Sequence, residues 1–200
     1  MTQIPFQLYS EPLPISVYGH IYRIPDYYTP SELHLLHSYV SNQPPMDSII
    51  YPNQQHPHAF TSDESPMVSS KTQWFYDNWD VICDMTETEH VSPWGYVKDT
   101  PSRIHEVLQS SPMGMRRYPR HSDLGVKCLT ILVPIHPCRG VSTTFYGGDD
   151  GDAYGVKNDG VTLDWDVNVG YMFRPSRVSF HSYEGLIDSD RYVMNVNLLV

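Results

Sequence analysis

Two patterns of hydrophobic positions divide the chain near residue 110. Before this point, apolar residues recur at the three- and four-residue spacing of helices, which predicts helices over residues 29–41, 70–88 and 101–109. After it, β-branched and aromatic residues form short runs broken by Gly, Pro and Asp, which predicts strands at 126–135, 141–146, 167–173, 177–183 and 191–200. Because crossover helices do not fit between these runs, we expect an antiparallel sandwich or barrel with the N-terminal helices on one outer face.

Two of the predicted helices begin with recognisable capping signals. Thr29 can cap the first helix, Pro30 suits its first position, and Glu32 can complete a capping box. Thr100 and Pro101 repeat the Thr-Pro start before the third predicted helix. Upstream of these helices, the alternating segment 15–24 is expected to form an edge strand.

Two segments have the composition of long connections. Residues 42–69 are rich in Pro, Gln, His, Asn and Ser, which predicts a loop, and the Gly and Asp run at 147–152 predicts a hairpin connection. The acidic run does not match an EF-hand, because it has no Glu at the twelfth position and no flanking helices. Since selectivity in a barrel resides in its loops, we expect 42–69 and 147–160 to contact a substrate.

Composition narrows the class of protein. With 200 residues, 40% of them hydrophobic, we expect a single domain, in which 1–110 forms a helical and loop-rich support and 111–200 the β core. A formal charge of -10 disfavours a nucleic-acid partner. The three cysteines include no C-x-x-C pair, and neither a signal peptide nor an apolar run of about 18 residues is visible. We therefore expect a cytoplasmic protein that does not bind a membrane.

The segment His121-Ser-Asp123 carries the first candidate chemistry. On an extended backbone, residues two apart point to the same side, so His121 and Asp123 can chelate one metal ion, with His181 as the candidate third ligand. With ten His and 23 acidic residues in the chain, about one His-x-acid pair is expected by chance, so the pair alone is weak evidence for a metal site. Two His and one carboxylate suit either a non-haem Fe(II) oxygenase or a catalytic zinc site.

The final predicted strand has one polar side. Alternate residues of 191–198 point in opposite directions, and one side consists of Arg191, Val193, Asn195 and Asn197. If the apolar side packs under the helices, Arg191 points into the barrel, where its guanidinium can hold a carboxylate. Arg174 and Arg177 are alternatives for this role. The cluster Arg116, Arg117 and Arg120 can receive an acidic substrate or pair with nearby carboxylates.

Residues 117–199 resemble the double-stranded β-helix core of the Fe(II)- and 2-oxoglutarate-dependent oxygenases, the superfamily that includes prolyl hydroxylases. The matching pieces are Tyr118-Pro-Arg-His121-Ser-Asp123, Leu129-Thr-Ile-Leu-Val133, Asn168-Val-Gly-Tyr-Met-Phe173, His181-Ser182 and Arg191. The resemblance implies a mainly β, jelly-roll or cupin-like fold with N-terminal helices. It also implies that His121, Asp123 and His181 bind Fe(II), and that Arg191 binds the distal carboxylate of 2-oxoglutarate.

The resemblance further implies a dioxygenase that uses O₂, hydroxylates a peptidyl residue or a small molecule, and releases succinate and CO₂. Many members place Ser two residues after the arginine, where this chain has Val193. Tyr118 or Thr130 is therefore the expected second partner of the carboxylate. Two alternatives remain, a zinc-dependent hydrolase with the same ligands and a non-catalytic β-sandwich binding module.

Overall fold

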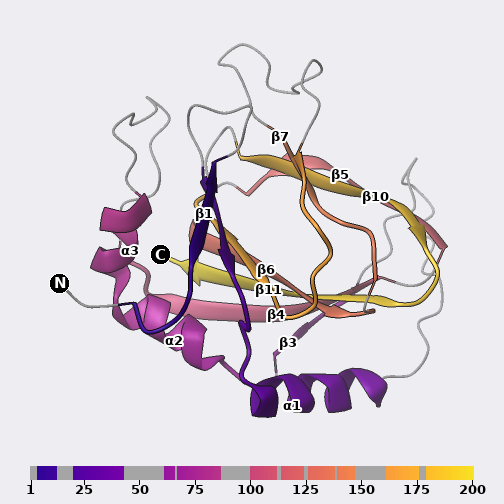
Figure 1. Ribbon diagram of the computed structural model, residues 1–200, viewed down its shortest axis with the longest axis horizontal. Helices are drawn as coiled ribbons and strands as arrows, with labels where there is room; N and C mark the ends of the chain where they lie inside the picture. The colour runs from indigo at the N-terminus through magenta and orange to yellow at the C-terminus, as the bar shows by residue number, and fades with distance from the viewer. Residues whose placement is uncertain are drawn as a thin grey trace.

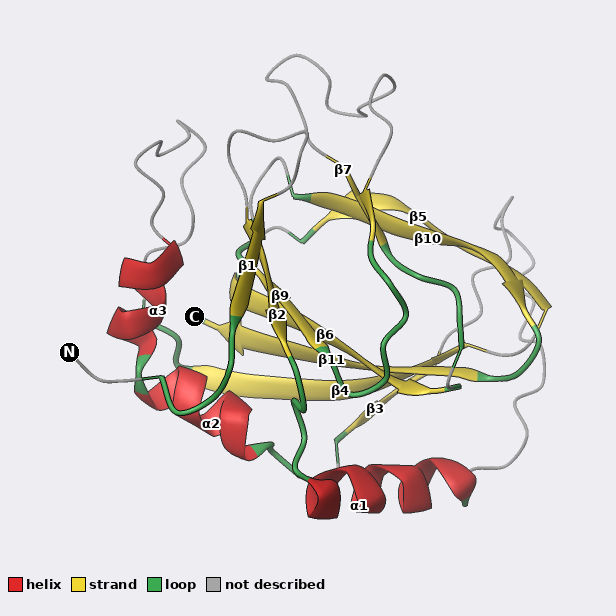
Figure 2. Ribbon diagram, viewed as in Figure 1, coloured by secondary structure: helices red, strands yellow, loops and turns green. Residues whose placement is uncertain are grey.

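The described strands of the computed structural model form two antiparallel sheets (Figures 1 and 2). The structure describes residues 4–12, 20–42, 61–65, 67–86, 100–111, 114–123, 126–137, 139–146, 161–175 and 179–200. The larger sheet has seven strands in the order β1 (Tyr9–Pro12), β2 (His20–Ile24), β9 (Gly170–Phe173), β6 (Lys127–His136), β11 (Arg191–Leu199), β4 (Arg103–Ser111) and β3 (Thr61–Glu64). The smaller sheet has four strands in the order β5 (Gly114–Ser122), β10 (Phe180–Ile187), β7 (Thr144–Tyr146) and β8 (Val161–Thr162).

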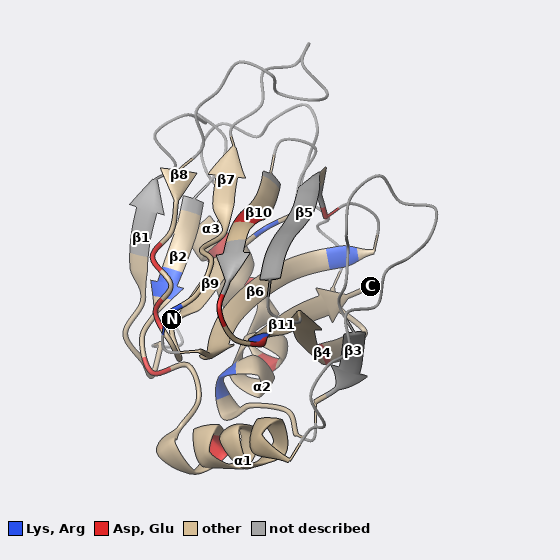
Figure 3. Ribbon diagram, turned by 90° about the vertical axis from the view of Figure 1, so that its right-hand side faces the viewer, with Lys and Arg blue, Asp and Glu red and all other residues tan. Residues whose placement is uncertain are grey.

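The molecule has three layers, with helices on one side of the larger sheet and the smaller sheet on the other (Figure 1). Figure 3, turned by 90°, shows α1 (Pro30–Ser41) and α2 (Ser70–Asp77) on the side away from β5 and β10. The predicted antiparallel, mainly β architecture with helices over one outer face is confirmed. Among the described residues, no helix is long and apolar enough to cross a membrane.

The side chains of strand β11, which lies between β6 and β4, contribute to two interiors on opposite faces of the larger sheet. Its Tyr192, Met194, Val196 and Leu198 belong to the large core beneath the helices, together with residues such as Leu36, Phe75 and Ile82. A smaller apolar cluster lies between the sheets, formed by Ile21, Phe145, Leu163, Tyr171 and Phe173. Because side chains alternate along a strand, Arg191, Val193 and Asn195 face this second interior, as the sequence pattern predicted.

The predicted helix over 29–41 is confirmed, and the one over 70–88 is interrupted. In α1, Thr29 and Glu32 form both halves of the expected capping box. The second segment consists of α2, capped by the Ser69 hydroxyl, and α3 (Trp79–Thr86). The break lies at Asn78, whose backbone and side-chain amides both donate to the Trp74 carbonyl. These bonds complete the end of α2 while the backbone leaves helical geometry.

The prediction of a helix over 101–109 was wrong, because this segment forms strand β4. Glu106 and Leu108 face the helices, whereas Gln109 and Ser111 face the smaller sheet. Pairing with β11 along all nine residues of β4 supplies backbone hydrogen bonds that outweigh the local Thr-Pro signal. Part of the expected loop 42–69 is also a strand, since β3 pairs with β4.

The predicted strands after residue 110 are confirmed with shifted ends. They correspond to β6, β7, β9, β10 and β11. The edge strand expected within 15–24 is β2, which pairs with β1. Residues 43–60, 66 and 147–160, which hold most of the two predicted connections, lie outside the described residues.

Candidate metal centre

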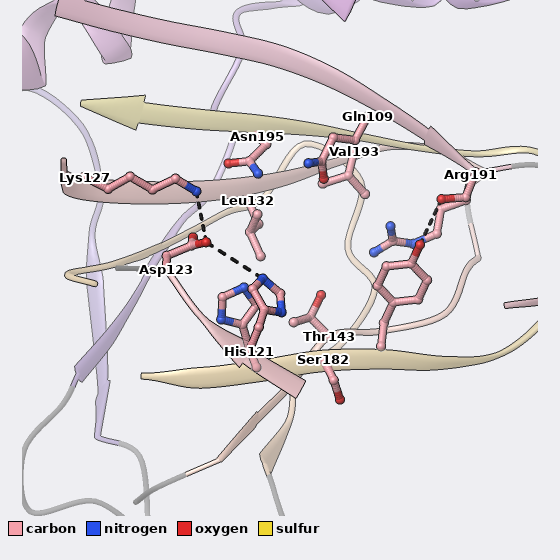
Figure 4. A pocket seen from close by; sticks show the side chains of 13 residues that line it. Gln109, His121, Asp123, Lys127, Leu132, Thr143, Ser182, Arg191, Val193 and Asn195 are labelled. Carbon is pink, nitrogen blue, oxygen red and sulfur yellow. Dashed lines mark hydrogen bonds and ion pairs between the residues drawn. The ribbon is translucent and has the colours of Figure 1, made fainter. Parts of the chain in front are cut away.

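Strand pairing brings His121 and His181 together although 60 residues separate them in the chain. His121 lies near the end of β5, and the antiparallel partner β10 places His181 directly opposite it. The centroids of the two imidazole rings are 4.3 Å apart. Asp123 follows β5 immediately, and one ligand atom from each of the three residues lies within 4.8 Å of the others. The structure thus assembles the three residues that the sequence predicted. Figure 4 shows His121 and Asp123 of this group.

The two carboxylate oxygens of Asp123 have different surroundings. Oδ1 lies 3.8 Å from His121 Nε2 and 2.9 Å from the ammonium of Lys127. Oδ2 accepts a hydrogen bond of 3.2 Å from the hydroxyl of Thr130, which is fully buried and also lies 3.1 Å from Asn197 Oδ1. Oδ1 is therefore the oxygen that faces the histidines, while Oδ2 is held against the sheet.

The electrostatics of the cluster favour the ligating forms of His181 and Asp123. Burial and the neighbouring His121 lower the pKa of His181 to about 4, so its imidazole is neutral at pH 7. Burial alone would raise the pKa of Asp123, but His181, Lys127 and His121 together bring it below its usual value. His181 Nδ1 lies 3.2 Å from the Ser179 carbonyl, which can only accept a hydrogen bond, so Nε2 is left with a free lone pair.

Aromatic side chains hold the ring of His181 in place. Phe145 stacks on it with a centroid distance of 5.4 Å, and Phe173 contacts it edge-on at 5.3 Å. These contacts leave the imidazole 6% exposed at the edge of the apolar cluster between the sheets. An orientation fixed on three sides, by two rings and a carbonyl, is typical of a ligand prepared for a metal.

A cavity of about 120 Å³ extends from the cluster to Arg191. Its lining includes the three cluster residues, Lys127, Gln109, Ser111, Leu132, Thr143, Ser182, Tyr183, Arg191, Val193 and Asn195. Figure 4 shows Arg191 at the opposite end of this group from Lys127 and Asp123. The cavity therefore joins the candidate metal ligands to a cation.

Arg191 is a buried cation without a carboxylate partner among the described residues. Its guanidinium lies over the rings of Tyr183 and Trp165, 4.1 Å and 4.7 Å from their centroids, and Nε donates to the Val141 carbonyl at 3.3 Å. Burial lowers the pKa of Arg191 to about 10, which leaves it charged at neutral pH. A buried charge of this kind is costly unless an anion joins it.

A pair of hydroxyl groups lies beside Arg191. Ser111 is the direct cross-strand neighbour of Arg191, and its Oγ lies 2.9 Å from the hydroxyl of Tyr183. Neither residue, nor Trp165, was predicted from the sequence as part of the site. Only Tyr183 carried a signal, because it stands two residues after His181 on a predicted strand.

The remaining candidates lie in different surroundings. Thr130 binds Asp123 and is absent from the cavity lining, and the backbone of Tyr118 lies opposite Tyr183. Arg174 contacts the helices, since its guanidinium lies 5.2 Å from the Trp79 ring and bonds Thr86 Oγ1. The side chains of Tyr118, Arg116, Arg117, Arg120 and Arg177 lie outside the described residues.

No protein-family model and no curated protein matches the chain. Solved structures do match. A prolyl-4-hydroxylase from Pseudomonas putida matches with a TM-score of 0.52 and 8% identity, covering 90% of this chain and 91% of that one. A prolyl hydroxylase from Trichoplax adhaerens, in complex with a peptide fragment of the hypoxia inducible factor oxygen degradation domain, matches with a TM-score of 0.55 and 13% identity, covering 90% and 83%. The resemblance to this superfamily is confirmed at the level of the fold.

Proposed function

We propose that this chain is an Fe(II)- and 2-oxoglutarate-dependent oxygenase with a double-stranded β-helix core. One observation carries the proposal. A single cavity contains the donor cluster His121, Asp123 and His181 and, away from it, the buried cation Arg191. The first can hold a metal and the second can hold a carboxylate, which is the combination that a chelating 2-oxo acid with a distal carboxylate requires.

The metal ligands fit Fe(II) in type and arrangement. Two imidazoles, of which that of His181 is neutral, and one carboxylate from one side of the cavity leave the opposite side open for exogenous ligands. Bound there with 2-oxoglutarate and O₂, the iron supplies the oxidising chemistry that hydroxylates a C–H bond while the co-substrate leaves as succinate and CO₂. The protein contributes binding, orientation and the exclusion of water.

Arg191 binds the distal carboxylate of the co-substrate. The rings of Tyr183 and Trp165 hold the guanidinium plane and keep water from it, which strengthens its attraction for an anion. Val193 cannot donate a hydrogen bond, so another residue must complete the carboxylate site. Thr130 and Tyr118 remain the candidates suggested by the sequence, and the Ser111–Tyr183 pair joins them because it lies beside Arg191.

The rest of the cavity receives the molecule to be hydroxylated. Lys127, Asn195 and Gln109 present polar groups on the side opposite Ser182 (Figure 4). We infer that the substrate is a peptidyl residue or a small molecule. The Trichoplax adhaerens structure contains a peptide, which supports the first of these.

Anaerobic titration of the Fe(II)-loaded protein with 2-oxoglutarate tests the function. We expect a weak visible charge-transfer band that saturates in the wild type and is missing in His181→Ala. Arg191→Met should need about 100-fold more 2-oxoglutarate, because a buried charge pair loses one partner. Arg23→Met is the matched control, since Arg23 pairs with Asp166 outside the cavity.

A 2-oxo acid without the distal carboxylate, 2-oxobutanoate, should bind the wild type and Arg191→Met equally well. The absence of a band at saturating co-substrate, with Arg191→Met behaving as the wild type, would refute the oxygenase. Tight zinc binding combined with that result would favour the hydrolase instead. Succinate formed without an added substrate would exclude a purely binding module.

A further inference from the structure

Lys127 contacts the proposed metal site without being a ligand. It is the first residue of β6, four residues after Asp123, and its Nζ lies 2.9 Å from Asp123 Oδ1. The ion pair is sheltered, with the two side chains 24% and 11% exposed. Lys127 also lines the cavity, so its ammonium lies where a bound cation would add to the local positive charge.

Only one carboxylate oxygen of Asp123 faces the proposed metal site. Thr130 holds Oδ2 from the buried side, so Asp123 has only Oδ1 to offer to the histidines, and His121 Nε2 lies 3.8 Å from that oxygen. Lys127 binds this same Oδ1. The ammonium of Lys127 thus requires the same oxygen atom as a metal ion would. That ion would be held by His121, Asp123 and His181.

We propose that Lys127 is a tethered cation that competes with the metal for Asp123 Oδ1, an inference that rests on the proposed function. Without a metal, the ammonium neutralises a carboxylate that would otherwise be buried without a counter-charge. When a divalent ion binds, two cations at one oxygen repel strongly in this sheltered cavity, and the ammonium leaves Oδ1. Lys127 therefore keeps Asp123 in its ligating position in the metal-free protein and weakens metal binding.

A supporting role for Lys127 would predict the opposite change in metal affinity. If Lys127 only positioned Asp123 for the metal, its removal would weaken metal binding, as the loss of a supporting contact to a ligand usually does. A competitor behaves differently, because its removal strengthens binding. The direction of the change in metal affinity therefore separates the two roles without any measurement of activity.

The experiment compares Mn(II) affinity by equilibrium dialysis and by the electron paramagnetic resonance signal of free Mn(II). We expect Lys127→Met to bind Mn(II) about tenfold more tightly than the wild type or better, since it removes a positive charge next to the ion. Lys127→Arg keeps the charge and should bind as the wild type does. Lys71→Met is the matched control, because Lys71 lies on α2 and donates to the backbone carbonyls of Asp26 and Tyr27.

Equal or weaker Mn(II) binding by Lys127→Met would overturn the inference, as would a Mn(II)-bound structure in which Lys127 stays within hydrogen-bond distance of Oδ1. Failure of the proposed function has a different signature. In that case neither the wild type nor Lys127→Met binds Mn(II), or His181→Ala binds it as well as the wild type. Binding by Lys127→Met alone, abolished by adding His181→Ala, would support competition.

Discussion

Glu106 and Arg191 are buried charged side chains on opposite faces of the seven-stranded sheet, and the contrast between them is instructive. Glu106 on β4 faces the helices, whereas Arg191 on the neighbouring β11 faces the cavity. Glu106 is 5% exposed and Arg191 is 4% exposed, so depth does not distinguish them. Their partners do.

The partners of Glu106 come from within the fold. Its Oε1 accepts hydrogen bonds from the Ser69 backbone amide and the Thr72 hydroxyl at the start of α2. Arg191 has two aromatic rings and one backbone carbonyl, and no carboxylate among the described residues. The charge on the helix face therefore anchors a helix to the sheet, while the charge on the cavity face is available to a ligand. Four predictions test this division.

Leu198→Ala should cost about 2–5 kcal/mol in the free energy of unfolding, because it opens a cavity in the core beneath the helices. Asn195→Ala, on the opposite face of the same strand, should cost only about 1 kcal/mol, because Asn195 lines an existing cavity and accepts a single hydrogen bond, from Asn197 Nδ2. Urea unfolding measures both. Similar losses for the two variants would break the distinction between the faces.

Arg191→Met should separate binding from stability. The roughly 100-fold loss of 2-oxoglutarate affinity should accompany a change of no more than about 1 kcal/mol in the free energy of unfolding, since the ligand-free guanidinium gains little in return for its desolvation. Thermal and urea unfolding with and without co-substrate provide the measurement. A large loss of stability in the ligand-free variant would show that Arg191 is structural.

Thr130→Val should weaken Mn(II) binding by about tenfold to 100-fold, because Asp123 Oδ2 loses its supporting hydroxyl while the side-chain shape is retained. This change has the opposite sign to that expected for Lys127→Met. Equilibrium dialysis compares the two variants directly. Thr162→Val is a control, since Thr162 bonds Thr144 at the exposed edge of the smaller sheet.

Glu106→Gln should flatten the dependence of stability on pH. Burial raises the pKa of Glu106 above its usual value, so the unfolded chain releases this proton at a lower pH than the folded protein does. The wild type should therefore lose stability as the pH rises from about 4.5 through the folded-state pKa, by at most about 1.4 kcal/mol per pH unit.

Glu106→Gln lacks this contribution. Its free energy of unfolding should therefore increase relative to that of the wild type as the pH rises. Urea unfolding between about pH 4.5 and pH 7 measures the difference. The same slope in both proteins would mean that Glu106 is ionised in the folded state throughout this range.

The elements that could be predicted from the sequence depend on neighbouring residues. Thr29 and Glu32 form a capping box through atoms three residues apart, and the alternation along 191–198 determines which side chains share a face. The candidate ligands His121 and Asp123 follow from the same period of two. Arg191 was found by parity along its strand and by resemblance, whereas His181 was found as a candidate third ligand and by resemblance.

Only the tertiary structure decided the features that depend on pairing between distant segments. The nine-residue pairing with β11 made 103–111 a strand despite its helix-start signal. The register of β10 against β5 placed His181 opposite His121. Contacts of Arg191 with Trp165, Tyr183 and Ser111 join four separate segments. Local periodicity can determine the direction of a side chain, but its partner depends on which strands exchange hydrogen bonds, and that choice is made by the whole chain.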